Sequence, residues 1–273
     1  MVCLSSGRLT TLSVAVLLVL GGGTFAGADA TPVDVELVLA VDVSRSMDVD
    51  EQRLQREGYI AAFRHREVLD AIVSGIYGRI AVTYVEWAGA ELQKVVVPWT
   101  VVDSPAKAEL FARRLEAPPL GRLRRTSISG AVSFATRLLE GNGYEGLRRV
   151  IDVSGDGPNN AGVPVASARD AAVAAGIVIN GLPILIKPRQ RAGFFDIDHL
   201  DMYFEDCVIG GPGAFTVPVA DRTELATAIR RKLVLEIAGR APHLIPASAG
   251  EPAPRMDCLI GEKLWELRRR YLE

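Results

Sequence analysis

The stretch VELVLAVDVSRS, at residues 35–46, decides the fold. Its first seven residues, Val35 to Val41, are almost continuously apolar, which is typical of a central strand that is covered on both faces of a sheet. Asp42, Ser44 and Ser46 follow where this strand ends, so one carboxylate and two hydroxyls lie on a single turn. The stretch therefore predicts a buried sheet with a polar loop at the carboxyl end of its first strand.

Strands and helices alternate along the rest of the chain. Apolar runs predict further strands at 80–87, 92–99, 149–154, 177–186 and 215–219, and helical spacing predicts helices at 51–72, 105–115, 127–140, 165–175, 197–206, 223–237 and 259–272. The second and third strands are joined by a hairpin at Gly89, and Pro98 suits an edge strand. This alternation predicts an α/β fold with a doubly wound, mostly parallel central sheet that is flanked by helices and has one antiparallel edge strand.

The N-terminal segment has the order of a secretory signal peptide. Arg8 precedes an apolar run at residues 9–20, and Ala28-Asp29-Ala30 provides a cleavage site. We expect a signal peptide at 1–30, one domain at 31–239, and a Pro-rich linker with a C-terminal helix at 240–273. The chain would then be exported to the periplasm or the extracellular space, with no membrane span after cleavage. An uncleaved membrane anchor is the alternative, although the apolar run is shorter than the roughly 20 residues that a spanning helix needs.

Net charge limits the classes of partner that the protein could bind, and the cysteines bear on the redox state of its compartment. The formal net charge is −2, from 31 Lys and Arg against 33 Asp and Glu residues, so no basic bias toward nucleic acid exists. Removal of residues 1–30 leaves only Cys207 and Cys258. In an oxidising compartment these thiols commonly pair, but spacing alone leaves open whether they form a disulfide or stay free and buried.

Three polar loops carry the chemistry. Besides Asp42, Ser44 and Ser46, they contain Thr126 at the start of a helix and Asp156 after the strand at 149–154. Ligands of open parallel sheets bind beyond the carboxyl ends of the strands, where such loops converge. Oxygen ligands suit a hard cation, so we expect Mg2+ bound by these five residues, with Mn2+ or Ca2+ as alternatives. Singly, each could instead cap a helix or satisfy loop backbone.

These motifs resemble the metal-ion-dependent adhesion site of von Willebrand factor A domains. The matching segments are Asp42-x-Ser44-x-Ser46, residues 126–131 beginning at Thr126, and residues 153–157 around Asp156. The resemblance, which covers about residues 35–237, implies that the two serines and the threonine bind the metal directly and that the aspartates act directly or through water. Residues 84–89 and 208–215 look most like a group of secreted bacterial domains of uncharacterised function.

The function implied is a metal-dependent binding or adhesion module that captures an acidic group of a protein or glycan partner. We do not expect an enzyme, because the three loops contain no histidine and neither aspartate has a partner that suggests a poised pKa. One alternative is a Mg2+-dependent hydrolase with Asp42 as nucleophile, although Ser44 stands where such enzymes usually carry a second aspartate. Another is a scaffold with a purely structural metal.

Two further signals stay open at the level of sequence. Glu86, at the end of an apolar strand, could lie near the metal, pair with an arginine or be an ordinary strand-end charge. The arginines at 122, 124 and 125 could steer an acidic partner toward Thr126 or form a solvated charge run.

Overall fold

The computed structural model describes residues 30–117, 119, 121, 123–186, 196–239 and 256–272. Its sheet has five strands in the order β3-β2-β1-β4-β5, with β1 at the centre. β1 pairs in parallel with β2 and β4, and β4 with β5, whereas β3 pairs antiparallel with β2 at one edge. The strands are β1 (Thr31–Asp42), β2 (Ile80–Trp87), β3 (Gln93–Val102), β4 (Tyr144–Gly155) and β5 (Ile177–Pro183). The predicted fold class and its antiparallel edge strand are therefore confirmed.

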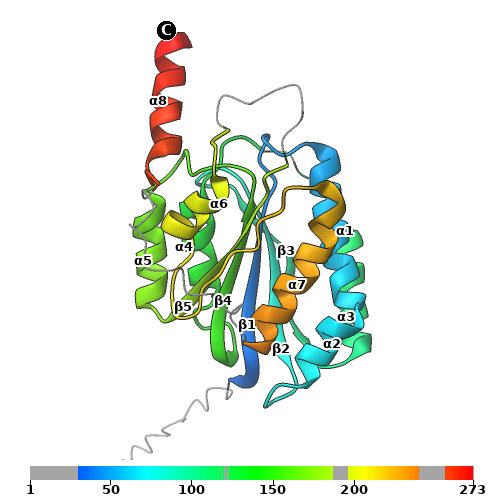
Figure 1. The fold of residues 1–273 in the computed structure, drawn as a ribbon. Coiled ribbons are helices and arrows are strands. Elements are labelled where there is room, and N and C mark those ends of the chain that lie inside the picture. Colours follow the sequence, from blue (N-terminus) through cyan, green and yellow to red (C-terminus); the bar gives the residue numbers. More distant parts are fainter. Residues whose placement is uncertain are drawn as a thin grey trace, which may run out of the picture.

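Helices cover both faces of the sheet (Figure 1). Leu37 and Leu39 of β1 pack into a core with α1 (Val49–Arg64), α2 (Arg66–Val73), α3 (Pro105–Glu116) and α7 (Leu225–Ala238). Val38 and Ala40 point the other way, into a core with α4 (Ile128–Leu138), α5 (Val165–Ala174) and α6 (Leu200–Tyr203). Because side chains alternate along a strand, an unbroken apolar run supplies both cores. Two short helices lie between α6 and α7: the π-helix η1 (Phe204–Val208), which follows α6, and the 3-10 helix η2 (Arg222–Glu224), which precedes α7.

The helix predicted at 51–72 is two helices, which is a correction. Asp48 caps α1 in a capping box with Glu51. At His65 the backbone becomes extended, with φ −83° and ψ 136°, and its Nδ1 accepts a hydrogen bond from the amide of Glu67 in the first turn of α2. Apolar residues keep the helical spacing on both sides of this break, so periodicity alone did not reveal it.

The strand predicted at 215–219 is also corrected. This segment makes only isolated bridges beside β5, at Thr216 and Val219. Pro183 at the end of β5 and Pro218 in the segment itself have no amide hydrogen, so a continuous ladder cannot form. The segment follows the edge of the sheet without joining it as a strand.

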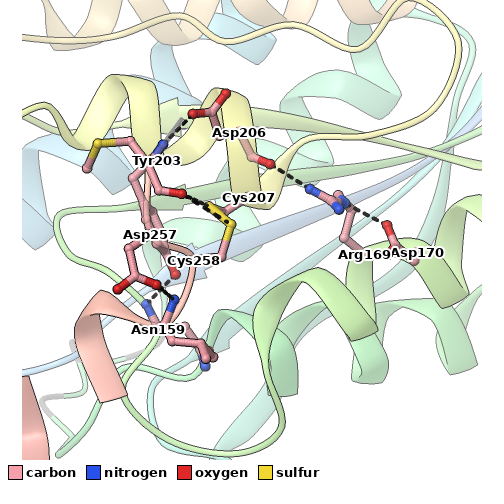
Figure 2. Close-up of a disulfide and its surroundings, with 10 residues drawn as sticks. Asn159, Arg169, Asp170, Tyr203, Asp206, Cys207, Asp257 and Cys258 are labelled. Carbon is pink, nitrogen blue, oxygen red and sulfur yellow. Dashed lines mark hydrogen bonds and ion pairs between the residues drawn. A yellow bond between two sulfur atoms is a disulfide. The ribbon is translucent and has the colours of Figure 1, made fainter. Parts of the chain in front are cut away.

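The C-terminal tail docks on the domain rather than standing apart from it. Cys258, just before α8 (Ile260–Leu272), forms a disulfide with Cys207 of η1, with their Cα atoms 5.4 Å apart (Figure 2). Ile260 and Leu264 pack against the core on the α4 and α5 side. The predicted signal peptide, apart from its last residue, and most of the predicted linker lie outside the described residues. In the described ranges, no helix combines the length and the apolar character needed to cross a membrane.

A buried group of charged side chains joins α7 to the sheet. The Nζ of Lys232 lies 2.6 Å from Asp152 Oδ1 on β4 and donates a hydrogen bond to Glu236 Oε1 one turn further along α7. Asn180 of β5 also donates to Glu236, at 3.0 Å, and Tyr59 of α1 donates to Asp152, at 3.4 Å. All three charged side chains are at most 1 % exposed, so two carboxylates share one ammonium away from water.

Glu236→Gln is expected to change the pH dependence of stability. Burial and the charge of Asp152 raise the pKa of Glu236 to about 7, against the opposing effect of Lys232. Between its unfolded pKa and about 7, the folded state therefore binds more protons, so the wild type should lose stability relative to the variant as pH rises from about 5 to about 8. Urea unfolding of both proteins across this range measures the difference. A pH-independent difference would contradict the shift.

Candidate metal site

The three polar loops meet at the carboxyl end of the sheet. Asp42 ends β1 and Gly155 ends β4, and these two strands are neighbours, so Asp156 follows directly beside the loop of Ser44 and Ser46. Thr126 lies in the segment before α4, which bridges to the first loop through Leu123 and Ser44. The structure thus brings together all five residues that the sequence singled out.

Hydrogen bonds link the five side chains into one cluster. Asp42 Oδ1 accepts from the amide of Ser44 at 2.7 Å, and the hydroxyls of Ser44 and Ser46 share a hydrogen bond of 2.7 Å. The hydroxyl of Ser46 donates to Asp156 Oδ1 at 2.6 Å, and Thr126 Oγ1 lies 3.4 Å from Ser44 Oγ. Asp42, Ser44 and Thr126 are buried, whereas Ser46 is exposed, so the cluster opens to solvent on the Ser46 side.

Backbone contacts fix the position of Thr126. Its amide donates to Asn160 Oδ1 at 3.0 Å, and its carbonyl accepts from the amide of Asn160 at 2.8 Å. The next residue, Ser127, donates its amide to Ala88 O and caps α4 by accepting from Gly130 N. The backbone that carries the Thr126 hydroxyl is therefore hydrogen-bonded on both sides, to the end of β2 and to the loop after β4.

Burial and nearby negative charges raise the pKa of both carboxyl groups. Burial raises the pKa of Asp42 well above its ordinary value, and the charge of Asp156 adds to this, while the amide and hydroxyl of Ser44 act against it. Burial likewise raises the pKa of Asp156 to about 7, although the hydroxyl of Ser46 stabilises its charged form. Asp42 Oδ2 is buried and has no hydrogen-bond partner among the described residues. The expectation that neither aspartate has a partner that suggests a poised pKa is therefore wrong for Asp42, because Asp156 is such a partner.

These residues fit a hard divalent cation. An orphaned carboxylate oxygen, a second carboxylate and three hydroxyls converge from three loops, and such oxygen donors are those that Mg2+ and Mn2+ accept. In the described part of the chain, no three His, Cys, Asp or Glu side chains gather where they could hold a metal ion. The candidate site consists instead of three hydroxyls and the two carboxylates of Asp42 and Asp156.

The structure also places residues that the sequence left open or that sequence reasoning missed. Glu86 forms a buried ion pair with Arg56 of α1, with both side chains 7 % exposed. Arg125 lies over the ring of Trp265 in α8, with its guanidinium carbon 3.5 Å from the ring centroid. Asn159 and Asn160, which anchor the segment around Thr126, were not singled out, because their role depends on contacts between distant loops.

Solved structures of low sequence identity share this fold. Proximal thread matrix protein 1 from the mussel byssus matches with a TM-score of 0.55 at 13% identity over 77% of this chain and 49% of that one. A von Willebrand factor type A protein from Catenulispora acidiphila matches with a TM-score of 0.52 at 14% identity, over 75% and 43%. The pilus adhesin SpaC from Lactobacillus rhamnosus GG matches with a TM-score of 0.54 at 12% identity, over 77% and 30%. The chain thus spans less than half of the length of each of these proteins.

Another structure of the mussel protein has a zinc-occupied metal-ion-dependent adhesion site. At these identities the likeness shows the fold, which is von Willebrand factor A-like. No curated protein matches the chain. A family model does match it, over residues 32–241, which is most of the 273 residues. The chain therefore belongs to the family described as protein of unknown function (DUF1194).

Proposed function

We propose that this domain is a binding module that captures an acidic group of a protein or glycan through a divalent cation, Mg2+ in the first place. The observation that carries the proposal is the convergence of Asp42, Ser44, Ser46, Thr126 and Asp156 into one hydrogen-bonded cluster that opens to solvent. In the mussel protein, a site of this type holds zinc.

The chain's own residues prepare the site for such a ligand. The amide of Ser44 orients Asp42, and the side-chain Oδ1 and backbone amide of Asn160 hold Thr126, so both proposed ligands are already in place without a cation. A bound cation would supply a positive centre with a coordination position left for a partner's carboxylate. Asp42 is fully buried, which does not favour the alternative in which its carboxylate attacks a substrate.

The disulfide supports the proposal that the protein is exported, with residues 1–30 as its signal peptide. Disulfides persist in the periplasm and outside the cell and are rare in the reducing cytosol. The bounds of β1 and α7, from Thr31 to Ala238, agree with a domain at 31–239. Residues 240–273 then add a linker and a helix that returns to the domain.

Titration calorimetry of the chelator-treated protein with Mg2+ and Mn2+ tests the metal site. We expect one site per chain, and Ser44→Ala should weaken binding by at least about tenfold, because one oxygen ligand is lost. Ser129→Ala is the matched control: its hydroxyl is also buried and follows Thr126 by three residues, but it faces Ser127 and Ala161 O. Absence of binding in the wild type would refute the proposal.

A carboxylate-coated sensor surface tests capture of an acidic group. The wild type and Ser129→Ala should be retained on it in Mg2+ and released by chelator, and Ser44→Ala should not be retained, whereas a hydroxyl-coated surface should retain none of them. Metal binding without Mg2+-dependent retention would favour a structural metal. Mg2+-dependent turnover of a phosphate ester that Asp42→Asn abolishes would favour the hydrolase.

A further inference from the structure

Helix α8 stands at the same end of the sheet as the candidate site. Figure 1 shows it rising beyond the carboxyl ends of the parallel strands, on the side of α5 and α6. The disulfide between Cys207 and Cys258 ties its start to η1, and Met256 adds an amide that donates to Asp206 at 2.7 Å (Figure 2). The helix is therefore anchored next to the loops that form the site.

The first turn of α8 contacts the loop after β4. Asn159 is fully buried, and its Nδ2 donates to Glu262 Oε1 at 2.7 Å and to Val163 O at 3.2 Å. Its Oδ1 accepts from the amide of Ser129 in the first turn of α4, at 3.0 Å. A Cβ on Gly261 would lie 2.0 Å from the carbonyl oxygen of Asn159, so helix and loop touch through their backbones. Glu262 thus binds the side chain of Asn159, which links the loop after β4 to the first turn of α4.

The second contact of α8 is with the segment before Thr126. Arg125 has φ 72°, a left-handed conformation that a residue with a side chain seldom adopts. Its guanidinium lies over the ring of Trp265, at 3.5 Å from the centroid, which is favourable cation–π geometry. Trp265 thus contacts the side chain of a residue whose backbone conformation is unfavourable and which directly precedes Thr126.

We propose that α8 is a brace that sets the position of Thr126, with Glu262 and Trp265 as positioning residues of the metal site. Arg125, which precedes Thr126, is held by Trp265, and Asn160, which binds both backbone groups of Thr126, follows directly after Asn159. Both supports of the Thr126 hydroxyl thus lead to one helix. The inference deepens the proposed function and rests on it, because Thr126 is one of the proposed ligands.

Substitutions in α8 with the disulfide intact test the brace. At the first position, Trp265→Leu removes the aromatic face that contacts Arg125, whereas Trp265→Tyr keeps an aromatic face. At the second position, Glu262→Leu removes the acceptor of the Asn159 hydrogen bond. Glu262→Gln keeps Oε1 as acceptor and replaces only Oε2, a buried atom without a partner among the described residues. Leu267→Ala is the control, since this side chain of the same helix is 46 % exposed. In every variant the tether at Cys258 remains.

Two measurements are needed on each variant. In metal-free protein, both Leu variants should accelerate hydrogen exchange of the Thr126 and Ser129 amides by about tenfold, with exchange in β1 at Leu39 unchanged. Calorimetry should show Mn2+ binding weakened about tenfold, the scale for residues that orient ligands. Trp265→Tyr, Glu262→Gln and Leu267→Ala should stay close to the wild type in both measurements.

The outcomes separate this inference from the proposed function. Unchanged exchange at Thr126 in both Leu variants would overturn the brace, and so would an equal acceleration at Leu39, because that reports global destabilisation. Faster exchange at Thr126 with unchanged Mn2+ affinity would also overturn it. If the wild type binds no metal, the proposed function fails. Helix α8 would then support the loops without positioning a metal ligand, so the inference would fail as well.

Discussion

Lys232→Met is expected to lower the free energy of unfolding by about 3–5 kcal/mol, the range for breaking a buried ion pair from one side. The substitution keeps the volume of the side chain but leaves Asp152 and Glu236 facing each other without the ammonium between them. Both carboxyl groups are at most 1 % exposed, so water cannot replace the lost charge. Urea unfolding followed by circular dichroism measures the loss, which should be larger at pH 8 than at pH 5, where Glu236 is protonated.

Two further variants test whether the loss of stability in Lys232→Met comes from the buried charges. Lys107→Met, on the exposed side of α3, changes the same residue type and should cost within about 0.5 kcal/mol. Adding Asp152→Asn and Glu236→Gln to Lys232→Met should restore much of the lost stability, because no uncompensated charge remains. A loss below about 1 kcal/mol for Lys232→Met alone would show that water or another cation reaches the two carboxylates.

The sequence pattern predicted the layers of this fold because burial on both faces leaves a readable signal. The apolar run of β1 and the bounds of β2 follow from strands that contact helices on either side. The break at His65 had no such signal, since both helices keep the same apolar spacing. Lys232 and Glu236 resemble an ordinary exposed pair on an amphipathic helix, and only their partners on β4 and β5 show that they are buried.

The candidate site could be predicted only in part, for a related reason. Asp42, Ser44 and Ser46 are close in sequence, and the topology of a parallel sheet places Thr126 and Asp156 beside them. The supports of these residues come from far along the chain: Glu262 and Trp265 lie in the C-terminal tail, which the disulfide between Cys207 and Cys258 ties to the domain. Spacing alone left that pairing open, so the role of α8 could not be deduced.

Asp42→Asn is expected to stabilise the metal-free protein and to abolish its stabilisation by metal. Asp42 Oδ2 is a buried acceptor without a partner among the described residues, and the charge of Asp156 opposes ionisation of the group. Asparagine keeps Oδ1, which accepts from the amide of Ser44, and replaces Oδ2 with a neutral donor. At pH 8 in chelator, the free energy of unfolding should therefore rise by about 1 kcal/mol, because the cost of burying a charge exceeds that of burying a neutral amide.

At saturating metal, the wild type should become more stable than Asp42→Asn. At a free Mg2+ concentration of about 100 times Kd, the wild type gains about 2.7 kcal/mol, whereas the variant gains almost nothing because it lacks the charged ligand. Thermal unfolding with chelator and with Mg2+ measures both effects, and Asp170→Asn, an exposed aspartate on α5, controls for the change in net charge. If the variant is less stable than the wild type in chelator, this prediction is contradicted, because the Asp42 carboxylate would then stabilise the metal-free fold. Under the proposed function, a bound cation would offset the cost of burying this carboxylate.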